Sequence, residues 1–109
     1  MIPIVNLEDK IKEIGSRPYH PIDVAKFNDQ VVRMALFRGE YHWHTHANED
    51  ELICVLKGRM TIKLKDHQDI TLSEGQMAVV PKGVEHCPIS SEDTYILMVE
   101  PANLQSKGD

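Results

Sequence analysis

Cysteine is scarce in this chain, with only Cys54 and Cys87 among 109 residues. Two cysteines cannot build the disulfide framework that holds many small secreted domains together. Long hydrophobic runs are missing as well, and none approaches the roughly 20 apolar residues that a membrane-spanning helix requires. The opening residues, MIPIVNLEDK, turn acidic early and lack the basic start and long apolar stretch of a secretory signal. We therefore expect a cytoplasmic protein with free thiols and no membrane partner.

Positive charge is also in short supply. The chain has 12 Lys and Arg residues against 17 Asp and Glu residues, which gives a net charge of −5 at pH 7. Because such a surface repels a phosphate backbone, nucleic acid is not an expected partner. The remaining composition is that of an ordinary globular domain, with 41% hydrophobic and 27% charged residues. A domain of this length buries a modest share of its surface, so association or a bound metal ion would stabilise it.

Hydrophobic periodicity predicts one short helix followed by strands. Leu7, Ile11 and Ile14 recur at helical spacing and Gly15 supplies a stop, so we expect a helix over residues 7–14. From Val31 onward, short apolar or alternating runs are separated by turn residues at regular intervals, which is typical of an all-β sandwich or barrel. The expected strands cover residues 31–37, 51–56, 59–65, 69–72, 77–81 and 94–100.

The chain shows no sign of a second domain. We interpret residues 31–109 as the barrel and residues 1–30 as an N-terminal arm that packs on the barrel or on a partner subunit. The apolar residues of this arm are candidates for extra strands that cover a barrel edge or cross to a second subunit; they are Ile2, Ile4, Val5, Ile22, Val24 and Phe27. Exposed sheet edges pair with other chains unless they are covered. We therefore expect a homodimer.

Four of the six histidines carry the main chemical signal. His42, His44 and His46 occupy alternate positions, so in a strand their side chains would share one face. Glu51 opens the next expected strand, and a strand–turn–strand connection can return its carboxylate to His46. His86 follows a Gly/Pro turn and could complete the set from a neighbouring strand. Neutral imidazoles with a carboxylate are suitable ligands for a divalent transition metal.

Simpler interpretations exist for several of these residues. A lone histidine on a strand is usually a surface or satisfied core residue, and it is the combination with Glu51 and a downstream histidine that favours a metal site. For His42 we expect a packed or solvated side chain, with a hydrogen bond to the ligands or proton transfer as the alternative. Glu49 and Asp50 fit a solvated turn. Both cysteines fit inert buried thiols.

Other large side chains are expected mainly in structural roles. Trp43 is expected to pack between sheets or at a subunit contact. Tyr41 and Tyr95 are candidates for lining a pocket. The methionines of the apolar strands are expected to fill the core rather than to bind metal; they are Met34, Met60, Met77 and Met98.

Residues 39–58 resemble the first signature motif of the cupin superfamily, G(x)5HxH(x)3–4E(x)6G. The chain has four residues rather than five between the first glycine and the first histidine. The matching positions are Gly39, His44, His46, Glu51 and Gly58.

Residues 75–90 resemble the second cupin motif, G(x)5PxG(x)2H(x)3N. A serine stands where the motif ends in asparagine, which removes one turn-stabilising side chain. The matching positions are Gly75, Pro81, Gly83, His86 and Ser90. Both motifs occur in the right order, and the resemblance extends over about residues 31–100.

The resemblance implies a cupin-like double-stranded β-helix, a barrel of the jelly-roll type. It also implies one divalent transition metal ion (Fe, Mn, Ni, Cu or Zn) in the mouth of the barrel. By position, His44, His46, Glu51 and His86 correspond to the three-His, one-Glu ligand set of the family. Such a set leaves coordination positions for water, dioxygen or a bidentate substrate.

Three functions are compatible with such a site. The first is a metal-dependent enzyme, for example a dioxygenase, that acts on a small polar metabolite. The second is a non-enzymatic module that binds or senses a small molecule, and the third is a metal-dependent isomerase or epimerase of sugar derivatives, which needs no oxygen. The sequence alone leaves it open whether the protein is an enzyme, because fold and family do not fix the chemistry of a site.

Overall fold

A short helix precedes the strands in the computed structural model, which describes residues 1–104 and 108. Helix α1 spans Leu7–Ile14, as predicted. It begins there because the side chain of Asn6 accepts a hydrogen bond from the backbone N–H of Glu8 at 3.0 Å. It ends at Gly15, which adopts a φ of 63° and donates its N–H to the carbonyl oxygen of Ile11.

Seven strands follow the helix within the described residues and confirm the all-β prediction. An additional strand forms in the N-terminal segment, and the last strand starts at His86 rather than at Thr94. The strands are β1 (Ile22–Phe27), β2 (Gln30–Glu40), β3 (Glu51–Lys57), β4 (Arg59–Leu64), β5 (Ile70–Ser73), β6 (Met77–Val80) and β7 (His86–Pro101).

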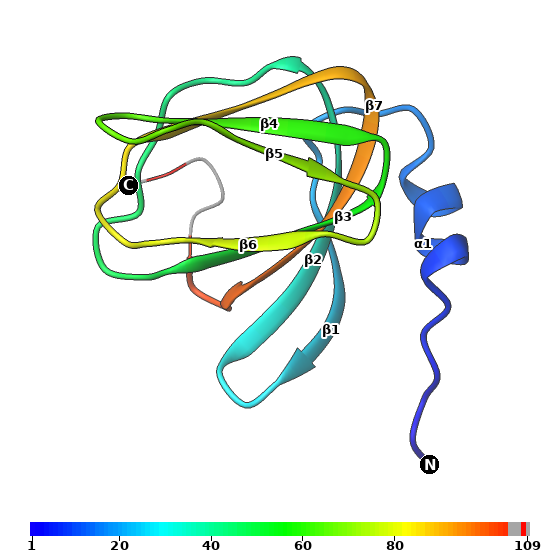
Figure 1. Cartoon of the computed structure of the whole chain (residues 1–109). Helices are drawn as coiled ribbons and strands as arrows, with labels where there is room; N and C mark the ends of the chain where they lie inside the picture. Colours follow the sequence, from blue (N-terminus) through cyan, green and yellow to red (C-terminus); the bar gives the residue numbers. More distant parts are fainter. Residues whose placement is uncertain (105–107, 109) are drawn as a thin grey trace.

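The strands form a jelly-roll barrel in which every pairing is antiparallel. Five strands lie side by side in the order β1-β2-β7-β3-β6, while β4 pairs with both β5 and β7. The long β7 joins the two layers, because residues 95–99 pair with β3 and residues 86–89 pair with β4 (Figure 1). The start of β7 therefore lies at a different part of the barrel from its end.

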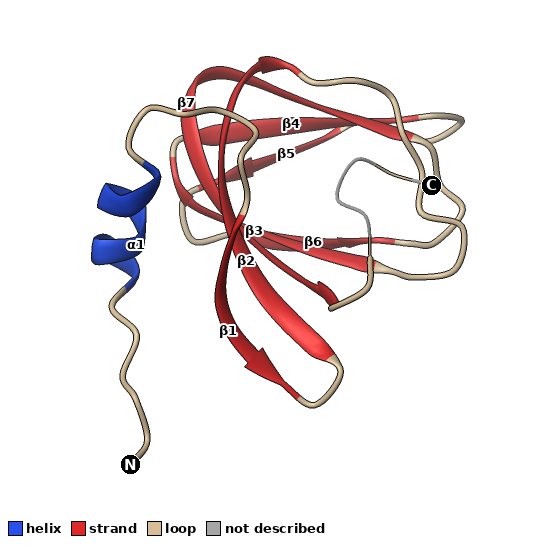
Figure 2. Ribbon diagram, turned by 180° about the vertical axis from the view of Figure 1, so that it is seen from behind, coloured by secondary structure: helices blue, strands red, loops and turns tan. Residues whose placement is uncertain are grey.

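Alternation along the strands separates a barrel interior from an outer face. The interior contains the main apolar core: Ala35, Phe37, Ile53, Val55, Met60, Ile62, Leu72, Val80, Ile96 and Met98. On the outer face, Ile14 of α1 packs against Met34 and Leu36 of β2. Figure 2 shows α1 outside the barrel, beside the sheet. Along the described residues, no helix is long and apolar enough to cross a membrane.

Two of the expected core residues are instead exposed. Met77 is 60% exposed, because on β6 it points outward while Ala78 and Val80 point toward the interior. Trp43 is 46% exposed on the connection between β2 and β3, so it does not pack between the sheets; a subunit contact, the other interpretation given for Trp43, stays a prediction. The other three methionines expected in the core are buried.

Candidate metal centre

The histidine-rich segment lies in the connection between β2 and β3. The sequence analysis considered this segment as a strand, but its backbone is irregular. An isolated bridge pairs it with β7: the N–H of His44 donates to His86 O at 3.0 Å, and the N–H of His86 donates to His44 O at 2.9 Å. The N–H of Gly83 donates to His46 O at 2.8 Å. These backbone bonds fasten the connection onto the start of β7 and onto the turn that precedes it.

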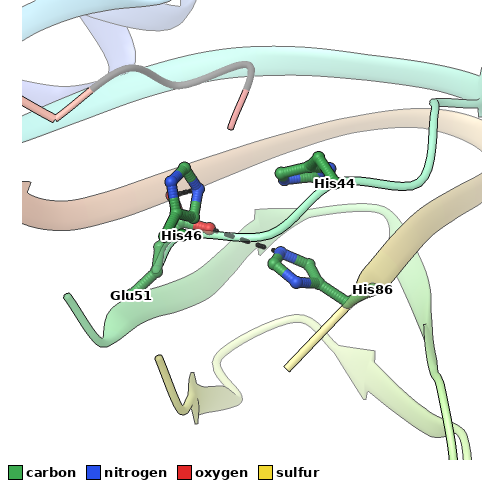
Figure 3. A group of neighbouring side chains, drawn as sticks. All are labelled: His44, His46, Glu51 and His86. Atoms are coloured by element: carbon green, nitrogen blue, oxygen red, sulfur yellow. Dashed lines mark ion pairs between the residues drawn. The ribbon is translucent and has the colours of Figure 1, made fainter. Parts of the chain in front are cut away.

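The structure brings the side chains of the four predicted ligands together (Figure 3). One ligand atom from each side chain lies within 4.8 Å of those from the other three. The Glu51 carboxylate lies between two imidazoles, with its oxygens 3.6 Å from His46 Nε2 and 3.8 Å from His86 Nε2. His44 is half-buried and the other three are buried.

His42 is exposed and is not a member of this group. Its ring packs against that of Tyr41 at a centroid distance of 3.9 Å, and it lies 5.4 Å from the ring of His44. The structure thus agrees with the packed or solvated side chain expected for His42. Because the segment is irregular, strict alternation does not apply, and only two of its three histidines enter the group.

Hydrogen bonds to the backbone orient two of the imidazoles. The Nδ1–H of His44 donates to His42 O at 3.0 Å, and the Nδ1–H of His86 donates to Val84 O at 2.9 Å. A neutral imidazole that donates through Nδ1 keeps a lone pair on Nε2. Such outer bonds fix both the tautomer and the ring orientation that a metal ligand requires.

Several buried nitrogen atoms at this centre lack a hydrogen-bond partner within the described part of the chain. They are His46 Nδ1, His46 Nε2 and His86 Nε2. An unsatisfied buried polar atom costs about 1–3 kcal/mol, and so native proteins rarely leave several in one place. A divalent cation would engage the Nε2 atoms, and the mix of imidazole and carboxylate donors suits a transition metal. The residues present therefore fit the ion that the sequence implies.

Electrostatics favour the ligand-competent protonation states. Burial lowers the pKa of His44 to about 4, and the neighbouring His86 and His46 act in the same direction. Burial on its own would raise the pKa of Glu51, but His86, Glu100 and His46 together hold it below its usual value. At neutral pH the centre thus presents a neutral His44 and an ionised Glu51, which is the state that a cation binds.

Glu100 and Arg33 are two charged residues at this centre that the sequence analysis did not identify. The pairing of β3 with β7 places Glu51 beside Glu100, because the residues adjacent to them, Leu52 and Val99, are paired. Glu100 is fully buried, and Arg33 Nη1 donates to it at 2.8 Å. Burial and the neighbouring Glu51 raise the pKa of Glu100 to about 8, which Arg33 opposes. Glu100 therefore behaves as a neutral carboxylic acid next to an ionised one.

Aromatic rings line one side of the centre. The ring of Tyr41 lies 5.4 Å from that of His44, stacks on Tyr19 at 4.9 Å and meets Phe37 edge-on at 5.5 Å. Burial raises the pKa of Tyr41, so its phenol is neutral at physiological pH. Tyr95 lies elsewhere: its hydroxyl donates to Gly15 O at 2.6 Å on the outer face. Of the two tyrosines considered for a pocket, only Tyr41 lies beside the centre.

Comparisons with known proteins agree with this architecture. Residues 32–100 match the family model of the cupin domain. The crystal structure of a cupin-2 domain containing protein from Shewanella frigidimarina superposes with a TM-score of 0.86. It is 38% identical in sequence, and the match covers 90% of this chain and 94% of that one.

Curated relatives match this chain as well. The uncharacterized protein YdbB of Bacillus subtilis (strain 168) is 40% identical over 77 residues, which are 71% of this chain and 68% of that protein. The 3-hydroxyanthranilate 3,4-dioxygenase 2 of Aspergillus fumigatus is 29% identical over 76 residues, which are 67% of this chain. The alignment spans only 40% of the length of that dioxygenase.

Proposed function

The chain belongs to the cupin family, and from this premise we propose that it is a metal-dependent dioxygenase of small polar molecules. In this proposal, one divalent transition metal ion is bound by His44, His46, Glu51 and His86. The observation that carries the proposal is the convergence of three imidazoles and one carboxylate within 4.8 Å. When bound, the ion would act as a Lewis acid, and it would keep coordination positions open for small molecules.

The residues of the chain have separate tasks in this proposal. His44 and His86 are held by their Nδ1 hydrogen bonds so that Nε2 faces the ion. Glu51 contributes the negative charge that reduces the charge of the bound ion. Tyr41 presents a neutral phenol beside His44, which can donate a hydrogen bond to a polar substrate group.

Hydroxylated aromatic compounds are the substrate class we propose to test first. The dioxygenase relative carries 3-hydroxyanthranilate, a hydroxylated aromatic acid, in its name. In this chain, the rings of Tyr41, Tyr19 and Phe37 form an aromatic wall beside the centre, against which a planar ring can pack.

Metal content tests the ligand assignment. We expect the wild-type protein to carry about one transition metal ion per chain and His44→Ala to lose it, because removing one donor leaves too few ligands for tight binding. His42→Ala is the matched control, since His42 is two residues away and outside the ligand group. Elemental analysis of the three purified proteins measures the difference. Equal metal in all three would show that His44 is not a ligand.

Oxygen consumption tests the reaction. The protein loaded in turn with Fe(II), Mn(II), Ni(II) and Cu(II) is assayed against a panel of hydroxylated aromatic acids with an oxygen electrode, and product is followed in parallel. A dioxygenase consumes oxygen and substrate together, and His44→Ala abolishes both. Product formed without oxygen would indicate an isomerase or epimerase, and a thermal shift without turnover would indicate a binding module.

We also propose that the protein is cytoplasmic and acts as a homodimer. Both cysteines are free, which suits a reducing compartment. Within the described residues, β1, β5 and β6 each pair with one other strand. Each of them therefore leaves an edge at which a second subunit can pair. Sedimentation of the purified protein tests the dimer, and a monomer at micromolar concentration would contradict it.

A further inference from the structure

Glu100 is a buried carboxyl group beside the candidate centre that the proposed function does not use. Its side chain is fully buried on β7, and it is not among the four side chains whose ligand atoms converge. Proteins almost never bury a carboxyl group completely unless it is paired. The partners of Glu100 therefore indicate what it does at this position.

Arg33 binds one oxygen of Glu100 and fixes its position. Its Nη1 donates to Glu100 Oε1 at 2.8 Å. The guanidinium is itself fastened, because it also donates to Asp23 Oδ1 at 3.1 Å and to the carbonyl oxygens of Ala102 and Leu104 at 3.0 Å and 3.1 Å. A guanidinium bound at this many points has little freedom to move. The carboxyl group of Glu100 is therefore held in one orientation.

The second oxygen of Glu100 lacks a donor. Glu100 Oε2 is buried and has no hydrogen-bond partner within the part of the chain that the structure describes. Its neighbour across the pairing of β3 with β7 is Glu51, and an ionised carboxylate only accepts hydrogen bonds. The two carboxyl groups can therefore be joined only by a proton that lies between them. Burial raises the pKa of Glu100 to about 8, and its hydrogen bond with Glu51 acts in the same direction, which places this proton on Glu100.

The orientation of Glu51 is what such a bond would control. Its oxygens lie 3.6 Å from His46 Nε2 and 3.8 Å from His86 Nε2 (Figure 3). Both separations exceed the length of a hydrogen bond, so neither imidazole holds the carboxylate in this way. Metal-ligating side chains are normally oriented by an outer hydrogen bond, as His86 is by its Nδ1–H. A donor outside the ligand group would serve Glu51 in the same way.

We propose that Glu100 positions the metal ligand Glu51 by donating a hydrogen bond from its carboxyl group to one oxygen of Glu51, while Arg33 holds Glu100 in place. The inference rests on the metal centre proposed above and adds the outer partner of its carboxylate ligand. Glu100 is a positioning residue, because it lies outside the group of converging ligand atoms. Its single hydrogen bond leaves the other oxygen of Glu51 for the ion.

The Zn(II) affinity of two replacements at this position tests the hydrogen bond. Dissociation constants of the full-length variants are measured at pH 7.5 by competition with a chelating dye. Glu100→Gln keeps an acceptor for Arg33 and offers an amide N–H to Glu51, so we expect it to bind Zn(II) like wild type. Glu100→Leu has no donor, and we expect it to bind Zn(II) about 10–100-fold more weakly. Glu92→Leu is the matched control, the same replacement at an exposed position of β7, and is expected to bind like wild type.

A double-mutant cycle with Glu51 distinguishes positioning from a merely structural role. We expect Glu51→Ala to weaken Zn(II) binding and Glu100→Leu to add no further loss in that background, because Glu100 acts through Glu51. If Glu100 only supported the fold around Arg33, the two fold-losses would multiply. Circular dichroism checks that each variant is folded. Glu100→Met is a second replacement without a donor, for use if Glu100→Leu does not fold.

The outcomes separate this inference from the metal centre itself. Equal weakening by Glu100→Gln and Glu100→Leu would mean that Glu100 acts through negative charge and not as a donor. Multiplied losses in the cycle, or an unchanged affinity of Glu100→Leu while His44→Ala is weakened, would overturn the positioning role and leave the metal centre standing. Equal Zn(II) affinity of wild type and His44→Ala would overturn both.

Discussion

Arg33 joins the candidate metal centre to the end of the chain. Its guanidinium donates to the buried Glu100 at 2.8 Å and to the exposed Asp23 at 3.1 Å. It also donates to the carbonyl oxygens of Ala102 and Leu104, at 3.0 Å and 3.1 Å. One side chain therefore holds the carboxyl group beside Glu51 and the segment that follows β7.

Replacing Arg33 by leucine tests the strength of this link. We expect Arg33→Leu to lower the free energy of unfolding by about 2 kcal/mol, because Glu100 and two carbonyl oxygens lose their donor. The loss stays moderate because Glu100, whose pKa is raised to about 8, carries no full negative charge that Arg33 must balance at pH 7. Arg38→Leu is the control: its pair with Asp93 is half-exposed on both sides, so we expect a much smaller loss than for Arg33→Leu. Urea unfolding of both variants at pH 7 measures the difference, and equal losses would contradict the assignment.

The lowered pKa of His44 predicts how acid affects the metal-free protein. Between the ordinary value of 6.5 and about 4, the unfolded chain binds a proton at this residue that the folded chain does not. The contribution of His44 to stability therefore falls as the pH drops through this range. Glu100, with a pKa raised from 4.5 to about 8, acts with the opposite sign, because its stabilising proton is lost as the pH rises.

Comparison of wild type with His44→Gln isolates the contribution of His44 to the free energy of unfolding. In the presence of a chelator, we expect the stability of wild type relative to His44→Gln to decrease steadily from pH 6.5 to pH 4. His42→Gln is expected to follow wild type, since His42 is exposed. Urea unfolding at several pH values provides the free energies. A constant difference between wild type and His44→Gln across this range would show that His44 titrates normally.

The sequence predicted the four convergent residues but not their charged neighbours. His44, His46, Glu51 and His86 stand out because imidazole spacing and turn residues form a recognisable pattern. Glu100 could have been found from alternation, since it shares the inward face of β7 with Ile96 and Met98. Its partner Arg33 carries no such signal, because their contact joins residues 67 positions apart and depends on strand order.

At the scale of elements, the turn between β3 and β4 depends on glycine for two reasons. Gly58 has a φ of 94°, and a Cβ there would lie 2.5 Å from Thr94 Oγ1 and 2.6 Å from Asp93 O. The same Thr94 hydroxyl donates to Arg59 O at 3.0 Å and accepts from the N–H of Arg59 at 3.1 Å. A side chain at Gly58 would thus disturb both the turn and its anchor on β7.

Comparison with Gly75 separates the cost of backbone strain at a positive φ from the cost of the close contact with β7. It also has a positive φ, of 82°, but a Cβ there would meet nothing within 4 Å. We expect Gly75→Ala to cost about 1 kcal/mol from backbone strain alone, and Gly58→Ala to cost at least about 2 kcal/mol more because atoms of β7 must move. Chemical denaturation measures both losses. Similar values for the two variants would mean that the contact with Thr94 is easily relieved.

Element prediction succeeded where local patterns decide the structure. The helical spacing and Gly15 predict α1, and turn residues mark the ends of the middle strands. It was less complete for β7, because the turn-like and polar residues between His86 and Asp93 hide a strand that only pairing with β2 and β4 stabilises. The segment 42–46 alternates like a strand, yet among the described residues it forms an isolated bridge to β7 at His44 rather than a strand pairing.

At the scale of the whole molecule, the sequence carried a signal for an apolar outer face beside β3. The run LICVL of residues 52–56 is apolar on both sides of β3, whereas a strand with one face in water normally alternates with polar residues. Which side chains of the neighbouring strands lie beside Leu52 could not be deduced from one strand. It required the register that aligns Leu52 with Val99 and Val79.

Metal binding is expected to stabilise the whole domain, because the four proposed ligands join separate parts of the barrel. They come from the β2–β3 connection, the start of β3 and the start of β7, so they converge only when the chain is folded. An ion bound to the folded state alone adds about 2.7 kcal/mol at 100 times its dissociation constant. For a domain of this size, that raises the melting temperature by about 10–20 °C.

Calorimetry of the chelator-treated protein, before and after addition of Mn(II), Fe(II) or Zn(II) at pH 7.5, measures this shift. We expect a metal-dependent rise in wild type and in His42→Ala, and none in His44→Ala, because only His44 belongs to the ligand group. Protein concentration is held constant across the series, since dimerisation also raises the melting temperature by mass action. A rise of equal size in His44→Ala would mean that the ion binds elsewhere on the protein.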